Sequence, residues 1–295
     1  MPPRRGKPAR RGAPGARGPR GPSDRGPSAR GARRPSERGQ SPSHRRTRRH
    51  GEAADRPKTP PVRPASRRSV APGAIDQALA RQPWDLLRAP LLQAGVDADE
   101  AIERLRRYAR LLLEWNRSAS NLISRNDELR IVERHLLESV APAHWLRETG
   151  CATWIDFGSG AGLPAIPLVV GGVPGPWTLV ESRRTKTLFI RKAVLELGLG
   201  QVVTENDRLE NVAANTLGNS MFDGFTSRAT MKLIPTLALA APLVAPGGSA
   251  FLWKGSGRDQ EMGQEARWRE AWEFTGLLGV GSGPNVVCRF VRRTT

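Results

Sequence analysis

The chain has 295 residues, which is enough for one or two domains, and its formal net charge is +19. The charge is unevenly distributed, because residues 1–70 hold 21 Lys and Arg against 4 Asp and Glu, which leaves the rest nearly neutral. There is no uninterrupted apolar run of about 18 residues and no apolar segment near the N-terminus, so we expect neither a membrane span nor a secretory signal.

Arg, Pro, Gly and Ser dominate residues 1–70, which contain no aromatic residue. Such a composition cannot bury enough apolar area to offset the entropy of the chain, so we predict a disordered basic tail. Two interpretations of the tail remain open. It attaches electrostatically to RNA phosphates, or it is a solvated segment without a specific role.

From about residue 71 the composition becomes that of a globular protein, and residues 71–150 are predicted to form an N-terminal helical extension. Apolar residues at helical spacing predict two longer helices, over 99–116 and 127–148. Asp97 or Asp99 can cap the first of them.

The second predicted helix is expected to bury Leu129, and it carries Arg134 and His135. We interpret His135 as a partly buried structural histidine rather than a catalytic one. Arg134 can reach either RNA or solvent.

The two cysteines, Cys151 and Cys288, are far apart in the sequence and have no metal-ligand spacing. We expect buried, unreactive thiols, no metal site, and a reducing cytoplasm as the location of the protein.

The second half of the chain alternates strands and helices, which is typical of a parallel sheet with helical crossovers. Helices are predicted from about residue 163, over 185–197 and around 231–241. Strands are predicted over 154–157, 177–180, 201–204, 224–227 and 249–253, with segments 270–276 and 286–292 completing the sheet.

Three glycines, Gly158, Gly160 and Gly162, directly follow the first predicted strand. Glycine permits positive φ and lets a ligand approach the backbone, and such loops hold nucleotide-like ligands at the carboxyl edge of a parallel sheet. G-x-G-x-x-G is the dinucleotide motif, whereas G-x-G-x-G after a strand with an acidic residue favours S-adenosylmethionine (SAM). We expect that acidic residue, Asp156, to anchor the backbone amides of the loop rather than to act as an acid.

Polar residues also stand where the other predicted strands end. Glu181 follows the second strand, where a carboxylate can accept hydrogen bonds from both hydroxyls of a ribose. Leu209 and Glu210 follow the third strand, where an apolar face and a polar edge can hold adenine. Arg228 and Lys254 end the fourth and fifth strands, near the methyl donor or the substrate.

The chain resembles the RsmG (GidB) family of 16S ribosomal RNA guanine-N7 methyltransferases over about residues 100–258. The order and spacing of short segments carry the resemblance: Trp115-Asn116-Arg117, Asn121-Leu122-Ile123-Ser124, Arg134-His135-Leu136-Leu137-Glu138-Ser139, Asp156 to Pro164, Ser227-Arg228-Ala229 and Trp253-Lys254-Gly255. The sequence departs from the family pattern at Ala165, where a second glycine often stands, and it matches only loosely after Arg258.

The resemblance implies a class I SAM-dependent methyltransferase (Rossmann-like) α/β fold, with the helical extension preceding a SAM-binding domain in residues 151–295. The SAM contacts of the family fall on Gly158, Leu163, Leu209, Glu210 and Arg228, and Glu181 matches the acidic end of the second strand. Together with Asp156 and Gly160, these are the predicted cofactor-binding residues.

The implied reaction is methyl transfer from SAM to N7 of one guanine in 16S rRNA, in the small subunit or its assembly precursor, by a monomeric cytoplasmic enzyme. Arg228 and Lys254 are the predicted catalytic residues, with a phosphate contact alone as the alternative for Lys254. Two other hypotheses stay open. One is a non-enzymatic RNA-binding assembly factor, and the other is an NAD-linked oxidoreductase, which the glycine spacing disfavours.

Overall fold

The computed structural model describes residues 73–215, 221–264 and 267–294. The chain divides into two units, residues 1–62 and 63–295, and all described residues belong to the second unit. The predicted disordered tail over residues 1–70 lies outside the described residues.

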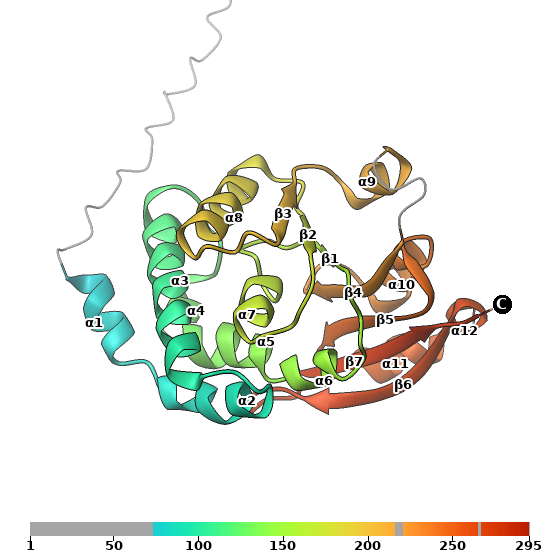
Figure 1. The fold of residues 1–295 in the computed structure, drawn as a ribbon, viewed down its shortest axis with the longest axis horizontal. Helices are drawn as coiled ribbons and strands as arrows, with labels where there is room; N and C mark the ends of the chain where they lie inside the picture. Colours follow the sequence, from blue (N-terminus) through green and yellow to red (C-terminus); the bar gives the residue numbers. More distant parts are fainter. Residues whose placement is uncertain (1–72, 216–220, 265–266, 295) are drawn as a thin grey trace, which may run out of the picture. The chain divides into compact units, whose positions relative to one another are not determined.

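A seven-stranded sheet in the order β3-β2-β1-β4-β5-β7-β6 forms the centre of this unit (Figure 1). The strands are β1 (Trp154–Phe157), β2 (Trp177–Val180), β3 (Val202–Glu205), β4 (Phe222–Arg228), β5 (Val244–Lys254), β6 (Trp272–Gly279) and β7 (Val286–Arg292). The first five are parallel, whereas β7 pairs antiparallel with both β5 and β6. The predicted α/β fold with a mainly parallel sheet is confirmed.

Successive residues of β1 point to opposite faces of the sheet and join two separate hydrophobic cores. Trp154 belongs to the core that also receives the N-terminal helices, and Ile155 belongs to the core on the other face. The Trp154 ring stacks on Trp177 with centroids 5.0 Å apart and planes 8° from parallel. Gly224 on β4 makes room for the stack, because a Cβ there would lie 2.1 Å from the Trp154 ring.

The helices that connect successive strands along the chain cover both faces of the sheet (Figure 1). They are α7 (Ala165–Val170), α8 (Arg184–Glu196), α9 (Leu209–Asn215), α10 (Leu233–Ala240), α11 (Arg258–Gln264) and α12 (Trp268–Ala271). The helices after β1, β2 and β4 were predicted from the sequence. The structure adds α11 and α12, which are short and had not been predicted.

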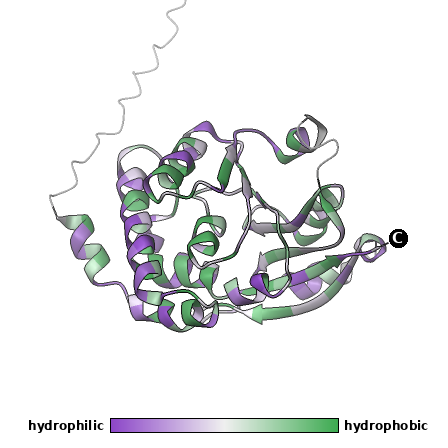
Figure 2. Cartoon of the chain, viewed as in Figure 1, coloured by the Kyte–Doolittle hydropathy of each residue, from purple (hydrophilic) through white to green (hydrophobic). Residues whose placement is uncertain are grey.

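The N-terminal helical extension is also confirmed, and its longest member is α3 (Ala98–Ser118). The Asp97 carboxylate caps this helix by accepting a hydrogen bond from the Glu100 amide at 2.9 Å. Figure 2 shows hydrophilic and hydrophobic residues interleaved along α3. Its apolar stripe packs against α7 and α8, so the extension and the sheet share one hydrophobic core.

Shorter helices surround α3 in the extension. They are α1 (Ala74–Ala80), the 3-10 helix η1 (Trp84–Leu87), α2 (Arg88–Gln93), α4 (Arg125–Glu128), the π-helix η2 (Val132–Leu137), α5 (Glu138–Val140) and α6 (Ala143–Arg147). No helix among the described ranges combines the length and the apolar content that crossing a bilayer demands.

The prediction of one continuous helix over 127–148 is wrong. The segment is divided into four pieces, and the last break falls at Pro142, which has no N–H to continue a helix. Leu129, which was expected to be buried, is 72% exposed at the end of α4. Bounds of several later strands also differ, most of all for β5, which begins at Val244 rather than 249. Leu209 opens the helix α9, which had not been predicted.

Candidate active site at the carboxyl ends of the parallel strands

The glycine loop leaves β1 at the carboxyl edge of the sheet, where ligands bind in open α/β folds. Gly158, Gly160 and Gly162 all have positive φ, between 58° and 81°. The amides of Gly158 and Ser159 donate to the carbonyl of Val180 at 2.9 and 3.1 Å, which ties the loop to the end of β2. The loop therefore has one defined path, which glycine makes possible.

A close contact joins this loop to the segment after β4. A Cβ on Gly158 would lie 2.2 Å from the Thr230 methyl group, so no larger residue fits there. The neighbouring Ala229 has φ 55°, an unfavourable conformation for a residue with a Cβ, and the Ser227 and Thr230 hydroxyls are hydrogen-bonded at 2.7 Å. Such strain persists only where the surrounding structure holds it, and it is concentrated at functional sites.

Glu181, the predicted ribose acceptor, is buried at the end of β2. Its Oε2 accepts from the Gly160 amide at 2.9 Å, and its Oε1 accepts from the Arg183 amide at 2.8 Å. An ionised carboxylate offers about four acceptor positions. Glu181 can therefore hold the glycine loop and still accept hydrogen bonds from a ligand.

Tyr108 of α3 supports the loop from the helical extension, a contact that the sequence did not predict. Its hydroxyl donates to the Ala161 carbonyl at 2.7 Å, and the side chain is fully buried. Burial raises the pKa of Tyr108 above its usual range, so the hydroxyl remains a donor. The available sequence signal was that the chain's single tyrosine lies within the apolar stripe of a predicted helix.

Asp156 of β1 is buried beside the loop, but its bonds differ from the expectation. Its Oδ1 accepts from the Thr226 hydroxyl at 2.6 Å rather than from a backbone amide of the loop, and Glu181 holds the Gly160 amide instead. The other oxygen, Oδ2, is buried without a hydrogen-bond partner among the described residues. Burial raises the pKa of Asp156 to about 7, against the lowering effect of the hydrogen bond from Thr226.

A pocket of about 180 Å³, here called the nucleoside pocket, opens between the ends of β1, β2 and β3. Its lining residues are Phe157, Gly158, Val180, Ser182, Asp207, Arg208, Leu209 and Glu210. Three predicted cofactor-binding residues, Gly158, Leu209 and Glu210, thus line one cavity. The structure places Gly160 and Leu163 in the adjoining loop rather than in the lining.

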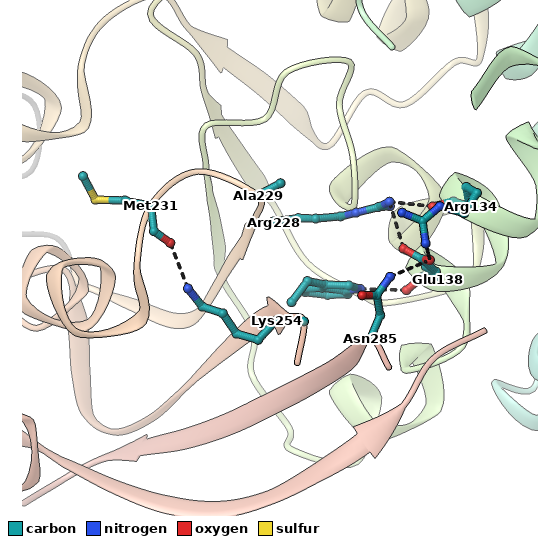
Figure 3. A pocket seen from close by; sticks show the side chains of 9 residues that line it. Arg134, Glu138, Arg228, Ala229, Met231, Lys254 and Asn285 are labelled. Atoms are coloured by element: carbon teal, nitrogen blue, oxygen red, sulfur yellow. Dashed lines mark hydrogen bonds and ion pairs between the residues drawn. The ribbon is translucent and has the colours of Figure 1, made fainter. Parts of the chain in front are cut away.

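A second pocket of about 310 Å³, here called the base pocket, lies beyond the ends of β4 and β5 (Figure 3). Its lining residues are Arg134, Glu138, Arg228, Ala229, Met231, Trp253, Lys254, Gly255 and Asn285. Both residues predicted to be catalytic line this pocket. Because Gly158 borders the nucleoside pocket and touches Thr230, next to Ala229, the two pockets lie on either side of that contact.

Arg228 turns toward the helical extension and is almost completely enclosed (Figure 3). Its guanidinium donates to the Arg134 and His135 carbonyls, to the Ser139 hydroxyl, and to Glu138 Oε2 at 3.0 Å. Burial lowers the pKa of Arg228 and the Glu138 carboxylate raises it. The side chain joins the end of β4 to η2 and α5.

Glu138 is the centre of this network, and sequence analysis did not assign it a role. Its Oε1 accepts from Arg134 at 3.0 Å and from the side-chain amide of Asn285 at 2.9 Å. Its Oε2 accepts from Arg228. Its backbone carbonyl also accepts from the Trp253 indole at 2.7 Å. Through its carboxylate and its backbone carbonyl, this one residue connects the helical extension, β4, β5 and the β6–β7 turn.

The side-chain ammonium of Lys254, at the end of β5, is held in place by two neighbouring residues. It donates to the Met231 carbonyl at 2.8 Å and lies 3.4 Å from Glu261 of α11. Burial lowers the pKa of Lys254, and the charge of Glu261 raises it. Lysine has three donors, so one N–H remains for a ligand.

His135 has the structural role that was preferred for it. Its Nδ1 lies 3.2 Å from the Arg228 guanidinium, and its Nε2 lies 3.8 Å from an oxygen of Asp127. Burial and the charge of Arg228 lower the pKa of His135 to about 4, so the ring is neutral at pH 7. Its Nδ1 is the acceptor for Arg228, which leaves the proton on Nε2.

Replacing Glu138 with alanine should lower the free energy of unfolding by about 3–5 kcal/mol, because two arginines would lose their buried counter-charge. Urea titration of both proteins measures the change. The matched control is Glu133→Ala, which removes the exposed ion pair with Arg130 and should cost about 1 kcal/mol or less. Equal losses for the two variants would contradict the central role of Glu138.

The unusual pKa of Asp156 predicts a pH-dependent stability. The Asp156 carboxyl keeps its proton up to about pH 7 in the folded state, but only up to about pH 3.8 in the unfolded chain. The stability that the protonated carboxyl gives to the fold is therefore complete below about pH 4 and is lost as the pH rises toward 7. The stability of Asp156→Asn relative to the parent should therefore rise by about 2–4 kcal/mol between pH 4 and pH 7.

Urea titrations of parent and variant at several pH values measure this difference. The control is Asp85→Asn on the exposed part of η1, where the difference should stay within about 0.5 kcal/mol. A pH-independent difference for Asp156→Asn would show that the buried carboxyl does not hold its proton.

The sequence model of the GidB family, described as rRNA small subunit methyltransferase G, matches residues 101–275. A relative from Aromatoleum aromaticum, named ribosomal RNA small subunit methyltransferase G, is 37% identical over 57% of this chain and 79% of its own length. Relatives of the same name from Sorangium cellulosum and Halorhodospira halophila are each 33% identical. They cover 68% and 67% of this chain, and 84% and 92% of their own lengths. The chain therefore belongs to the GidB family, the rRNA small subunit methyltransferase G proteins.

Proposed function

We propose that this protein transfers a methyl group from SAM to N7 of a guanine in the 16S RNA of the small ribosomal subunit. The observation that carries the proposal is the pair of pockets on either side of the Gly158–Thr230 contact, in a chain of this family. We also propose that it acts as a monomer in the cytoplasm, where its buried free thiols would stay reduced.

The residues around the glycine loop fit SAM. Phe157 and Leu209 give the nucleoside pocket apolar walls for adenine, and Glu181 retains acceptor capacity for the ribose hydroxyls. Glu181 and Glu210 place carboxylates beside the loop and the nucleoside pocket, which suits a ligand that carries a sulfonium charge. When bound, SAM supplies the electrophilic methyl group.

The base pocket fits an acceptor that needs no general base. N7 of guanine has a free lone pair, so its methylation requires alignment and exclusion of water rather than removal of a proton. His135, which contacts Arg228 of this pocket, is neutral and already hydrogen-bonded to that arginine. The protein therefore contributes chiefly by holding the base in position.

The basic side chains of the pocket are paired with acidic ones, which matters for a base that becomes positive as it is methylated. Glu138 and Glu261 balance two of the three positive charges of Arg134, Arg228 and Lys254, which limits the repulsion of the methylated base. In this proposal Arg228 is a positioning residue that fixes the end of β4. Lys254 offers its remaining N–H to the base or to an RNA phosphate.

Mapping N7-methylguanine in small-subunit rRNA from cells with and without the gene tests the proposal. One guanine should lose its methyl group in the deletion strain and regain it when the gene is restored. Gly158→Ala should fail to restore it and should weaken SAM binding at least about tenfold, because the new Cβ displaces Thr230 or the loop.

Gly279→Ala, where a Cβ meets nothing within 4 Å, is the matched control and should restore methylation fully. An unchanged N7-methylguanine content after deletion would refute the proposed activity. It would leave a non-enzymatic role in subunit assembly as the better hypothesis.

We further propose that the basic segment 1–70 strengthens binding to RNA through phosphate contacts. It carries 21 Lys and Arg against 4 Asp and Glu, and phosphate binding releases counterions. Deleting residues 1–70 should weaken RNA binding and flatten its dependence on salt concentration while leaving SAM affinity unchanged. Filter binding at several salt concentrations measures the slope, and an identical slope without the segment would exclude this role.

A further inference from the structure

The turn between β6 and β7 closes one side of the base pocket. The Val280 amide donates to the Asn285 carbonyl at 3.0 Å, which closes the turn, and a Cβ on Gly281 would lie 3.5 Å from Glu138. Asn285 follows residue 275, where the match to the GidB family model ends. This wall of the pocket therefore comes from a part of the chain to which the family match assigns no role.

The orientation of the Asn285 side chain follows from its partner. Its Nδ2 donates to Glu138 Oε1 at 2.9 Å, and an ionised carboxylate can only accept, so the amide nitrogen must face Glu138. The Oδ1 atom is then turned away from Glu138 (Figure 3). It would lie 3.7 Å from a Cβ added to Gly255. Within the described ranges no residue donates a hydrogen bond to Oδ1, so the base pocket contains an oriented acceptor.

Asn285 and Ala229, which both line this pocket, lie on opposite sides of the Arg228 side chain (Figure 3). Ala229, next to the Gly158–Thr230 contact, forms the wall nearest the loop, and Asn285 belongs to the wall formed with Glu138 and Gly255. In guanine the 2-amino group lies across the ring system from N7. A base whose N7 faces the methyl donor therefore directs its 2-amino group toward the far wall.

Guanine is the standard RNA base with a 2-amino donor, so an acceptor at this place distinguishes it from adenine. Glu138 is less available for this task, because it already accepts hydrogen bonds from Arg134, Arg228 and Asn285. We propose that the side-chain carbonyl of Asn285 selects guanine by accepting a hydrogen bond from its 2-amino group. The inference rests on the proposed guanine-N7 methylation and adds the residue that reads the base.

The same contact favours the reaction as well as the choice of base. As N7 takes the methyl group, the base gains positive charge and its amino hydrogens become stronger donors. A hydrogen bond that strengthens in this way stabilises the transition state more than the bound substrate, and so raises the rate of methyl transfer.

The test compares guanine with inosine, which lacks the 2-amino group and keeps N7. Small-subunit rRNA is prepared by ligation with either base at the methylated position, and it is offered naked and after assembly into subunits. The parent protein should show a kcat/KM about tenfold higher for guanine, because inosine leaves the acceptor unpaired. Asn285→Leu and Asn285→Ala should reduce this ratio to near one.

The ratio is measured within each variant, so it does not depend on the fraction of protein that folds. Asn126→Leu, on the exposed surface of α4, is the matched control and should keep the parent ratio. A parent protein that accepts inosine as well as guanine, or Asn285 variants that keep the parent ratio, would overturn this inference and leave N7 methylation standing. A parent protein that methylates no guanine would refute both.

Discussion

The buried carboxylate of Glu138 is the interaction on which the arrangement of the site depends. It lies between two arginines and an asparagine from three different parts of the chain, and its own carbonyl holds the Trp253 indole. Taking a carboxylate out of water costs several kcal/mol, which only full compensation can offset. Because each partner comes from a different element, the compensation is complete only when the helical extension, β4 and the β6–β7 turn are all in place.

The glycine loop has a parallel set of supports. Glu181 holds the Gly160 amide from one side, and Tyr108 of the helical extension holds the Ala161 carbonyl from the other. The helical extension therefore supports the glycine loop as well as the base pocket. The sheet supplies the strand ends, and the helices that precede it fix the conformation of the loop and the side chains that follow those ends.

Much of the sheet followed from sequence, because a short apolar strand followed by a glycine or a charged residue is a local pattern. Trp154–Phe157 and Trp177–Val180 were predicted with the bounds that the structure shows. The division of 127–148 was missed, because its apolar spacing resembles that of one helix. The partners of Glu138 could not be predicted either, since Arg228 and Asn285 are 90 and 147 positions away in the sequence.

The position of β7 between β5 and β6 has a consequence for how the protein is made. Synthesis proceeds from the N-terminus, so β1, β2, β4 and the glycine loop leave the ribosome well before residues 286–292. Until those residues emerge, β5 has an unpaired edge and Asn285 is absent from the pocket. A growing chain thus acquires its glycine loop first and the β6–β7 wall of the base pocket last, so under the proposed function an unfinished sheet lacks the residue that selects guanine.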